Sequence, residues 1–541
     1  MSHPEAGAST DPSSAQTQGW LAAGFSLRRG ILNLFSLLAF LIVGLSLSSS
    51  WFQPPPQTQL DLFQTHLALQ ASRTLDDPRY QDLARALLGQ DIFQLALNRY
   101  QQTAENYAER LKRLKRLAQP VPTAVTEALT GTDTAAPEPT EPSPVDPVLL
   151  ASMQDLQTEL DALWLRSGLL HAYQENLEEA ERQWQQLLDP ERPVELESSQ
   201  KAVARVLQGL WGTPRRILPD AEVQIRNHLD GWFEAVALQR LYRLQQRSDS
   251  LNALNQQQEK LALSALFRLA VVAGIPTLGA LLGLLLLVGW VSWSLWHKQP
   301  LLGPAWDPPW PGIGVQAVLT GWFLGFILLN SVVPQLYGII LGLQSRQLSP
   351  WHQAVALFLT YNSGALLGAG LLYRLLHRYP ASPRVLQVRL FGSWLLWGVC
   401  GYLVALPLVV LAAALSQLLL PQAGGGNPIL PLLLDSQGWG ARLVFFAVVS
   451  LCAPIFEEVL FRGFWLAALS RYLPMWGAVL VSALTFALAH LNLSDLLPLT
   501  MLGIVLGVIY SHSRNLLAPM LLHSLWNTGS LVTLLVLGGA R

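Results

Sequence analysis

Two adjacent carboxylates lie in an otherwise apolar segment near the C-terminal end of the chain. The segment PIFEEVLFR contains Glu457, Glu458 and Arg462. A charge at membrane depth costs ~3 kcal/mol on insertion scales, so ionisable residues there usually have a function. Glu458 and Arg462 are four residues apart and can pair on one helix face, whereas Glu457 lies about 100° around the helix. We therefore predict a structural ion pair between Glu458 and Arg462, and an unpaired carboxylate at Glu457 that suits general-base chemistry.

Two further pairs of residues, each with at least one polar member, lie on the apolar segments that follow. Phe486 and His490 are four residues apart, as are His523 and Asn527, so the members of each pair share a helix face. A carboxylate, two imidazoles and a carboxamide are sufficient to activate water and stabilise an oxyanion. The candidate catalytic residues are therefore Glu457, His490, His523 and Asn527, with Phe486 in support. Either histidine taken alone is equally compatible with a hydrogen bond between helices.

In this order, EExxxR, FxxxH and HxxxN resemble the signature of the CPBP family, which comprises CAAX prenyl endopeptidases and Abi-type bacteriocin-processing or immunity proteins. The resemblance covers residues 390–537. It implies an all-helical membrane fold and an intramembrane protease in which Glu457 and His490 activate the attacking water. It also implies that His523 and Asn527 bind the carbonyl oxygen of the scissile peptide bond.

The resemblance leaves the substrate and the metal dependence open. Eukaryotic members of the family cleave near the C-terminus of farnesylated CAAX substrates, but an unmodified membrane peptide is equally compatible with this chain. Older descriptions of the family treat it as metal-dependent, and Glu457, His490 and His523 would supply three zinc ligands. We favour a mechanism without a cofactor, in which the glutamate acts as the base, and keep zinc as the alternative.

The composition is that of a membrane protein. Hydrophobic residues make up 51% of the 541 residues and charged residues only 13%, whereas soluble proteins carry about 25% charged residues. The net charge of −1 gives no basic surface for nucleic acid, so we expect no nucleic-acid partner. The two cysteines, Cys400 and Cys452, both lie in apolar runs, which indicates core packing.

The N-terminal part is predicted to contain a tail and a first membrane helix. Residues 1–27 are rich in Ser, Gln and Ala without apolar periodicity, which predicts a disordered tail. The apolar run from Ile31 to Leu47 predicts a transmembrane helix within residues 28–50. A secretory signal peptide is the alternative, although the run is longer than is usual for one.

Residues 51–262 differ from the rest of the chain in being polar. Apolar residues recur there at helical spacing, which predicts an extramembrane α-helical domain, interrupted by a Pro-rich linker at 119–148. One stretch has the spacing of a tetratricopeptide-like helix pair. The residues at this spacing are Trp164, Gly168, Ala180 and Trp184. An ordinary helical bundle with a tryptophan core is the alternative.

Apolar spans dominate the remainder of the chain, with accessory transmembrane helices in 263–389 and the protease-like core in 390–541. We expect spans near 269–294, 314–342, 352–373, 390–419, 441–461, 475–492, 496–511 and 516–537, which makes nine with the first helix. The connection 374–389 contains four arginines and no acidic residue, so it is expected to face the cytoplasm. The N-terminus is then cytoplasmic and the domain 51–262 extracytoplasmic.

These observations together predict an all-α polytopic transmembrane bundle with an inserted extramembrane helical domain. The predicted function is an intramembrane endopeptidase that cleaves near the C-terminus of a membrane-associated substrate. The expected partners are membrane lipid, a peptide or protein substrate in the membrane, and a protein bound by the domain 51–262. The alternatives are a transporter or proton-relay protein, because membrane carboxylates and histidines also mark ion pathways, and a non-catalytic scaffold for the helical domain.

Overall fold

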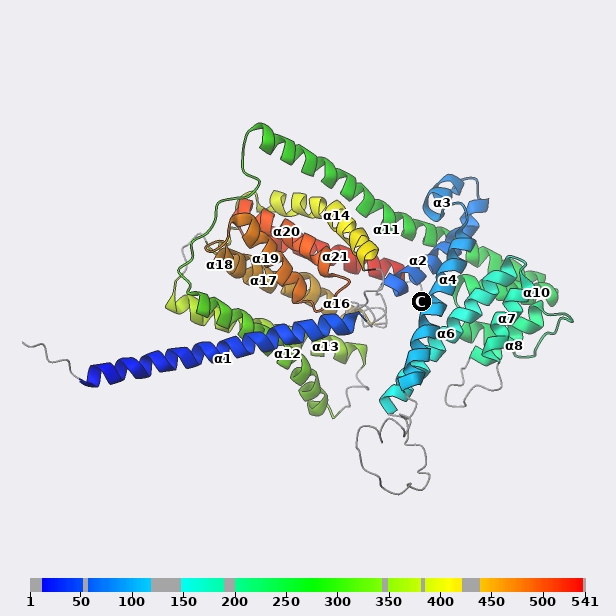
Figure 1. The fold of residues 1–541 in the computed structure, drawn as a ribbon. Coiled ribbons are helices and arrows are strands. Elements are labelled where there is room, and N and C mark those ends of the chain that lie inside the picture. Colours follow the sequence, from blue (N-terminus) through cyan, green and yellow to red (C-terminus); the bar gives the residue numbers. More distant parts are fainter. Residues whose placement is uncertain are drawn as a thin grey trace, which may run out of the picture. The chain divides into compact units, whose positions relative to one another are not determined.

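The computed structural model describes residues 12–51, 57–117, 147–188, 200–342, 349–380, 385–420 and 438–538. Every regular element within these ranges is a helix (Figure 1), which confirms the predicted all-α class. The chain divides into two compact units. We call Thr58–Ala273 the helical unit, and Met1–Gln57 together with Gly274–Arg541 the membrane unit. The predicted linker 119–148 lies almost entirely outside the described residues.

The helical unit is built from two long helices, α4 and α6, and several shorter ones with buried apolar side chains between them. Its elements are α2 (Gln57–Ala71), a 3₁₀ turn (Ser72–Asp76), α3 (Gln81–Leu88), α4 (Ile92–Leu117), α6 (Pro147–Tyr173), α7 (Leu177–Leu187), α8 (Gln200–Trp211), α9 (Ala221–His228), α10 (Gly231–Leu244) and the first half of α11 (Ser248–Trp296). Between α6 and α7, the buried ring of Trp184 packs directly on Gly168, and its Nε1 donates to the Leu165 carbonyl at 3.3 Å. Two of the residues at the tetratricopeptide-like spacing therefore meet across one helix pair, while the repeat interpretation stays a prediction.

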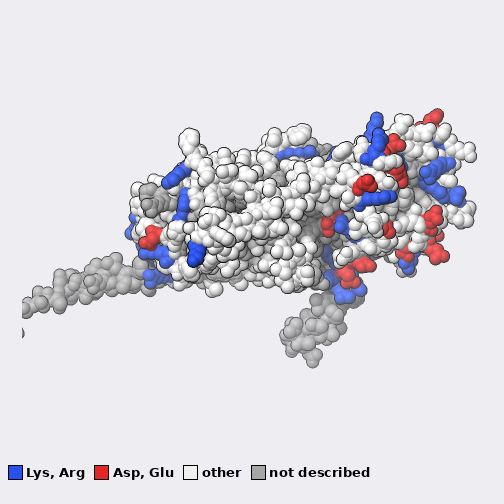
Figure 2. All heavy atoms as spheres, turned by 90° about the horizontal axis from the view of Figure 1, so that it is seen from above, with Lys and Arg blue, Asp and Glu red and all other residues white. Residues whose placement is uncertain are grey.

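Within the described residues, eight helices are long and apolar enough to cross a membrane, as expected for a multi-pass membrane protein. They are Leu27–Ser50 of α1, α11, α12 (Gly312–Ile340), α13 (Pro350–Arg378), α14 (Trp394–Leu419), the broken helix Trp439–Leu469, α20 (Leu496–Ser513) and α21 (Leu517–Gly538, of which Leu517–Leu537 is counted). Large apolar side chains are exposed along most of these helices. In Figure 2 charged side chains of both signs cover the helical unit, whereas few interrupt the flank of the membrane unit. Lipid is the medium that would cover such a flank.

The span expected at 475–492 is shorter than predicted. Its helix, α19 (Met475–Leu488), has 14 residues, which corresponds to roughly 21 Å of a hydrocarbon core about 30 Å thick. The chain leaves the helix there, and Leu491 adopts a left-handed conformation with φ of 57°. An L-residue in that conformation cannot continue a right-handed helix.

The first helix begins earlier than the sequence indicates. α1 (Pro12–Ser50) extends into the segment 1–27 that was expected to be a tail. Two sequence features allow this extension: proline is well tolerated in the first turn of a helix, and Ala, Gln and Leu in residues 15–23 are good helix formers. Residues 1–11 lie outside the described part of the chain.

Two arginines that are expected on the same side of the membrane both donate hydrogen bonds to one loop. Arg471 Nη1 donates to the Pro308 carbonyl at 3.1 Å, and Arg514 Nη2 donates to the Pro304 carbonyl. The guanidinium of Arg514 also lies 3.9 Å from the centre of the Trp306 ring. This loop joins α11 to α12, so the α18–α19 and α20–α21 connections lie at the same end of the bundle as Lys298.

The topology prediction can be tested by cysteine labelling in intact cells. In a variant without Cys400 and Cys452, a cysteine at exposed Arg182 of the helical unit should react with a membrane-impermeant maleimide. A cysteine at exposed Lys298 should react only after the membrane is permeabilised. Labelling of Lys298→Cys in intact cells would show that the orientation is inverted.

Candidate active site

The predicted ion pair lies at the centre of the membrane unit. Arg462 Nη1 is 2.9 Å from Glu458 Oε1, and the two side chains are 1% and 0% exposed. Arg462 Nη2 also donates to the Gly503 carbonyl of α20 at 3.3 Å, and its guanidinium lies 4.5 Å from the centre of the Phe486 ring of α19. Because buried charges need partners in a low-dielectric interior, these contacts hold three helices around one arginine.

His523 lies between the two carboxylates. Its Nδ1 is 2.8 Å from Glu458 Oε1, and its Nε2 is 3.9 Å from Glu457 Oε2. An ionised Glu458 can only accept, so Nδ1 carries the proton and donates to it. In a neutral imidazole Nε2 is then the unprotonated nitrogen, and it faces Glu457. The sequence predicted the residues of this cluster, but not that His523 bridges them.

Glu457 has a hydrogen-bond partner that the motifs do not include. The hydroxyl of Tyr361, on α13, donates to Glu457 Oε1 at 3.0 Å. Glu457 was expected to be unpaired, so this contact and the nearby His523 correct that prediction: the carboxylate lies among neutral or titratable groups. The one sequence signal for Tyr361 is the polar run Thr360 to Ser363 inside an apolar span, which is costly in a membrane helix and therefore informative.

Phe486 separates the two histidines. Its ring is perpendicular to that of His523 at 5.7 Å and near-perpendicular to that of His490 at 4.9 Å between centroids. His490 Nδ1 contacts the Phe486 carbonyl at 2.9 Å. The structure therefore brings Glu457, Glu458, Arg462 and His523 together directly and connects His490 to them through Phe486.

The helix that carries both glutamates is broken by two π-helical segments. It consists of α16 (Trp439–Ala447), a π-helix (Val448–Cys452), α17 (Ala453–Glu458), a second π-helix (Val459–Leu466) and α18 (Ala467–Leu469). The N–H of Ala453 donates to the Val448 carbonyl, five residues earlier. In this register the next donor would be residue 454, a proline, which has no N–H.

Side chains of α21 replace the missing backbone donors. Asn527 Nδ2 donates to the Val449 carbonyl at 2.7 Å, and the Ser524 hydroxyl donates to the Ser450 carbonyl. An amide nitrogen has two hydrogens, so Asn527 keeps one donor for another acceptor. Pro454 thus explains both the break in the helix and the attachment of α21 beside Glu457.

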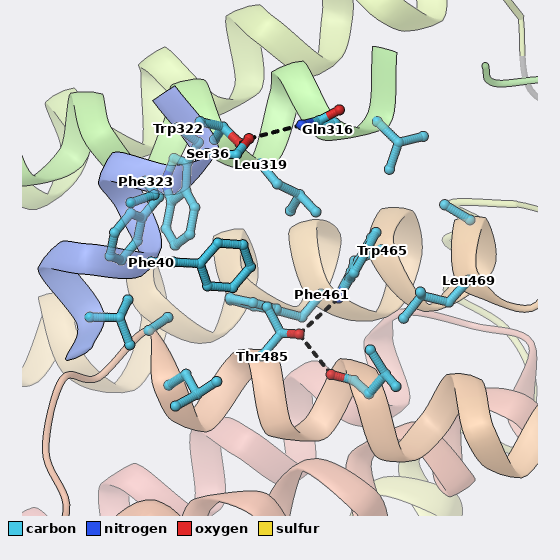
Figure 3. A pocket seen from close by; sticks show the side chains of 18 of the residues that line it. Ser36, Phe40, Gln316, Leu319, Trp322, Phe323, Phe461, Trp465, Leu469 and Thr485 are labelled. Atoms are coloured by element: carbon cyan, nitrogen blue, oxygen red, sulfur yellow. Dashed lines mark hydrogen bonds between the residues drawn. The ribbon is translucent and has the colours of Figure 1, made fainter. Parts of the chain in front are cut away.

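An apolar pocket adjoins this cluster. It has a volume of about 580 Å³ and lies between α1, α12, α19 and the broken helix. In Figure 3 Phe40, Leu319, Phe323 and Phe461 surround the space, with the Trp465–Thr485 hydrogen bond on one side. Phe461 follows Glu457 by one helical turn, and its ring contacts that of Phe486 at 5.3 Å. Phe461 therefore lines the pocket on one side and contacts the cluster of Glu458, Arg462 and His523 through Phe486 on the other.

The zinc alternative requires three ligands around one point. In the part of the chain that the structure describes, no group of three His, Cys, Asp or Glu side chains lies close enough to hold a metal ion. Glu457, His490 and His523 therefore do not form the preorganised ligand set that zinc requires. We assign no step of the reaction to a metal.

The fold and the site define a multi-pass membrane protein with a buried carboxylate–imidazole centre. Residues 439–529 match the family described as "Type II CAAX prenyl endopeptidase Rce1-like". This match confirms the resemblance drawn from the three motifs, all of which lie within the matched residues.

Two curated proteins are similar to a part of the chain. "Putative membrane peptidase YdiL" of Bacillus subtilis (strain 168) is 31% identical over 81 residues, or 15% of this chain and 33% of that protein. An "Uncharacterized 24.3 kDa protein" of Escherichia coli is 39% identical over 80 residues, or 14% of this chain and 37% of that protein. The chain thus spans about a third of the length of these relatives. No solved structure was found to match it.

The buried ion pair predicts a large difference between two arginine substitutions. Arg462→Met leaves Glu458 buried without its cation, which should destabilise the fold by about 3–5 kcal/mol. Arg182, 69% exposed and paired with Glu179, is the matched control, and Arg182→Met should cost under about 1 kcal/mol. Thermal unfolding in lipid nanodiscs measures both, and equal melting temperatures would contradict a structural role for the buried pair.

Proposed function

We propose that this protein is an intramembrane endopeptidase that hydrolyses a peptide bond near the C-terminus of a membrane-associated substrate. The observation that carries the proposal is the position of His523 between Glu457 and Glu458, deep among membrane helices. A charged pair and an imidazole at this depth are costly to bury, which favours a functional role over a structural one. The family match and the name of the Bacillus subtilis relative support the same reaction class.

Glu457 acts as the general base in the proposed mechanism. It takes a proton from water, and the resulting hydroxide attacks the carbonyl carbon of the scissile bond. His490 assists from the other side of Phe486 by orienting the water. When the tetrahedral intermediate collapses, the C–N bond breaks and Glu457 returns its proton to the leaving amine, so no net proton is gained or lost.

His523 and Asn527 stabilise the oxyanion of the intermediate. The N–H of Asn527 that is not bound to Val449 is available to donate. His523 supplies a second donor in its imidazolium form, in which Nε2 as well as Nδ1 carries a hydrogen. Removal of one such donor typically lowers kcat by about 10²- to 10³-fold. Glu458 and Arg462 hold these groups in place and take no part in bond making.

The apolar pocket favours a substrate with a hydrocarbon group. None of the described residues that line it is Asp, Glu, Lys or Arg. Its volume lies within the range of about 300–1,000 Å³ that is usual for ligand pockets. A prenyl group next to a CAAX-type cleavage site has the length and polarity to occupy it. Large apolar side chains of an unmodified peptide are the other group that could occupy this pocket.

The substrate class is tested by filling the pocket. Leu319→Trp places an indole in it and should lower kcat/KM for a farnesylated peptide by at least about tenfold, with a smaller effect on the unmodified peptide. Leu328→Trp is the matched control, because Leu328 lies on the same helix and is 62% exposed. Equal effects of Leu319→Trp on both peptides would argue against a lipid-modified substrate.

The reaction itself is tested with purified protein in liposomes. Glu457→Gln should lower kcat about 10²- to 10⁴-fold, because the amide cannot accept the proton of water. Glu259→Gln, at an exposed position of the helical unit, should behave as wild type. Cleavage should also persist after exhaustive chelation.

Four outcomes would contradict the proposal. Cleavage by Glu457→Gln at the wild-type rate would exclude the glutamate mechanism, and loss of cleavage on chelation would favour the zinc alternative. If no peptide is cleaved while a proton flux across the liposomes depends on Glu457, the protein is a proton-relay protein instead. If neither activity exists and the cellular role needs only the helical unit, the bundle is a scaffold.

A further inference from the structure

The hydroxyl of Tyr361 lies against Glu457, although Tyr361 belongs to none of the three motifs and lies outside the matched residues 439–529. It is 3.0 Å from Glu457 Oε1 and 3.5 Å from the Ala453 carbonyl. A phenol has one hydrogen, and the shorter contact, to an acceptor that carries charge when ionised, is the stronger one. Tyr361 therefore donates to Glu457.

The tyrosine ring is held in place by close packing between α12 and α13. Phe326 of α12 meets the Tyr361 ring nearly perpendicularly, with 5.9 Å between the centroids. Gly364, one turn further along α13, has no side chain and lets Phe326 pack directly against the backbone. A side chain packed in this way loses little entropy when it forms its hydrogen bond, so the hydroxyl is preorganised.

The two carboxylate oxygens of Glu457 are occupied differently. Oε1 accepts from Tyr361, whereas Oε2 faces His523 Nε2 at 3.9 Å. This distance exceeds that of a hydrogen bond, and it leaves Oε2 as the oxygen that can accept a proton. Without the phenol, the carboxylate could rotate and exchange its oxygens.

We infer that Tyr361 is a positioning residue that fixes the general base, holding Glu457 Oε1 so that Oε2 is directed toward the attacking water. The inference rests on the proposed function of Glu457. A phenylalanine would fill the same space, but only the hydroxyl can fix the carboxylate. Burying a hydroxyl is costly unless it is hydrogen-bonded, so Tyr361 and Glu457 depend on each other.

The effect of this hydrogen bond can be separated from that of the other polar groups nearby. The titratable and charged groups around the pair come from α21 and from the broken helix itself. They are His523, Glu458, Arg462 and Cys452. None of them is altered by a substitution at Tyr361, so a change in kcat reports on the phenol.

The test compares Tyr361→Phe with Tyr373→Phe, which removes a hydroxyl from the same helix at a position 69% exposed. Tyr361→Phe should lower kcat about 10- to 100-fold with less than a twofold change in KM. A residue that only supported the fold would not lower kcat while leaving KM unchanged. Tyr373→Phe should match wild type in both respects.

The outcomes separate this inference from the proposed function. If Tyr361→Phe keeps the wild-type kcat while Glu457→Gln is inactive, the positioning role is wrong and the peptidase stands. If Glu457→Gln is fully active, the peptidase mechanism itself fails. Should Tyr361→Phe not fold, 3-fluorotyrosine at position 361 keeps the ring and gives a stronger donor. This variant should keep a kcat within about threefold of wild type, and a kcat as low as that of Glu457→Gln would overturn the inference.

Discussion

The buried contact between Arg462 and Glu458 is the interaction on which the rest of the membrane unit depends. An isolated charge in a medium of low dielectric is very costly, so the pair persists only with further polar contacts around it. Here a single oxygen, Glu458 Oε1, accepts from both Arg462 and His523, while the arginine also reaches the Gly503 carbonyl. The broken helix, α20 and α21 can therefore be arranged in few ways without leaving a charge unpaired. The same network that stabilises the bundle also fixes the orientation of the His523 ring.

The break in the helix connects this architecture to the chemistry. In a regular α-helix the backbone carbonyls accept hydrogen bonds from the helix's own N–H groups. Such a helix would offer no free carbonyl to the side chains of Asn527 and Ser524. Pro454 removes one backbone donor, and the π-helical register before it leaves the carbonyls of Val449 and Ser450 to side chains of α21. Single-turn π-segments are often found at functional sites, because they redirect side chains at small cost. Here the second π-segment begins at Val459, directly after Glu458.

Local spacing predicted the parts of the site that lie within one helix, and no more than those. The pair Glu458–Arg462 follows from residues four apart, and the contact between Phe486 and His490 has the same origin. The contacts that join different helices were not predictable, because a single sequence does not contain the register between them.

Three features in particular could not be predicted from the sequence. Tyr361 donates to a carboxylate 96 residues away, and His523 was expected near the site but not between its two glutamates. The π-segments are not visible in the apolar spacing, and the partner of Glu457 lies on another helix, which a helical-wheel argument about one helix does not include. The all-α class and the membrane composition were predictable because they depend on the summed apolar character of long segments, not on any one contact.

The first helix, α1, lines the apolar pocket on one face and exposes large apolar side chains on another. α1 is separated from α12 by more than 250 residues of sequence, yet Ser36 contacts Thr320 at 2.9 Å and accepts from Gln316 at 2.9 Å. In a hydrocarbon medium such polar contacts replace the hydrophobic effect as the force that selects a helix pair. They place Phe40 over the apolar pocket whose opposite wall includes Phe461 (Figure 3). Phe461 connects this pocket to the buried cluster, because its ring also contacts that of Phe486, with 5.3 Å between the centroids. The contacts of α1 with α12 therefore shape a space that adjoins the buried ion pair.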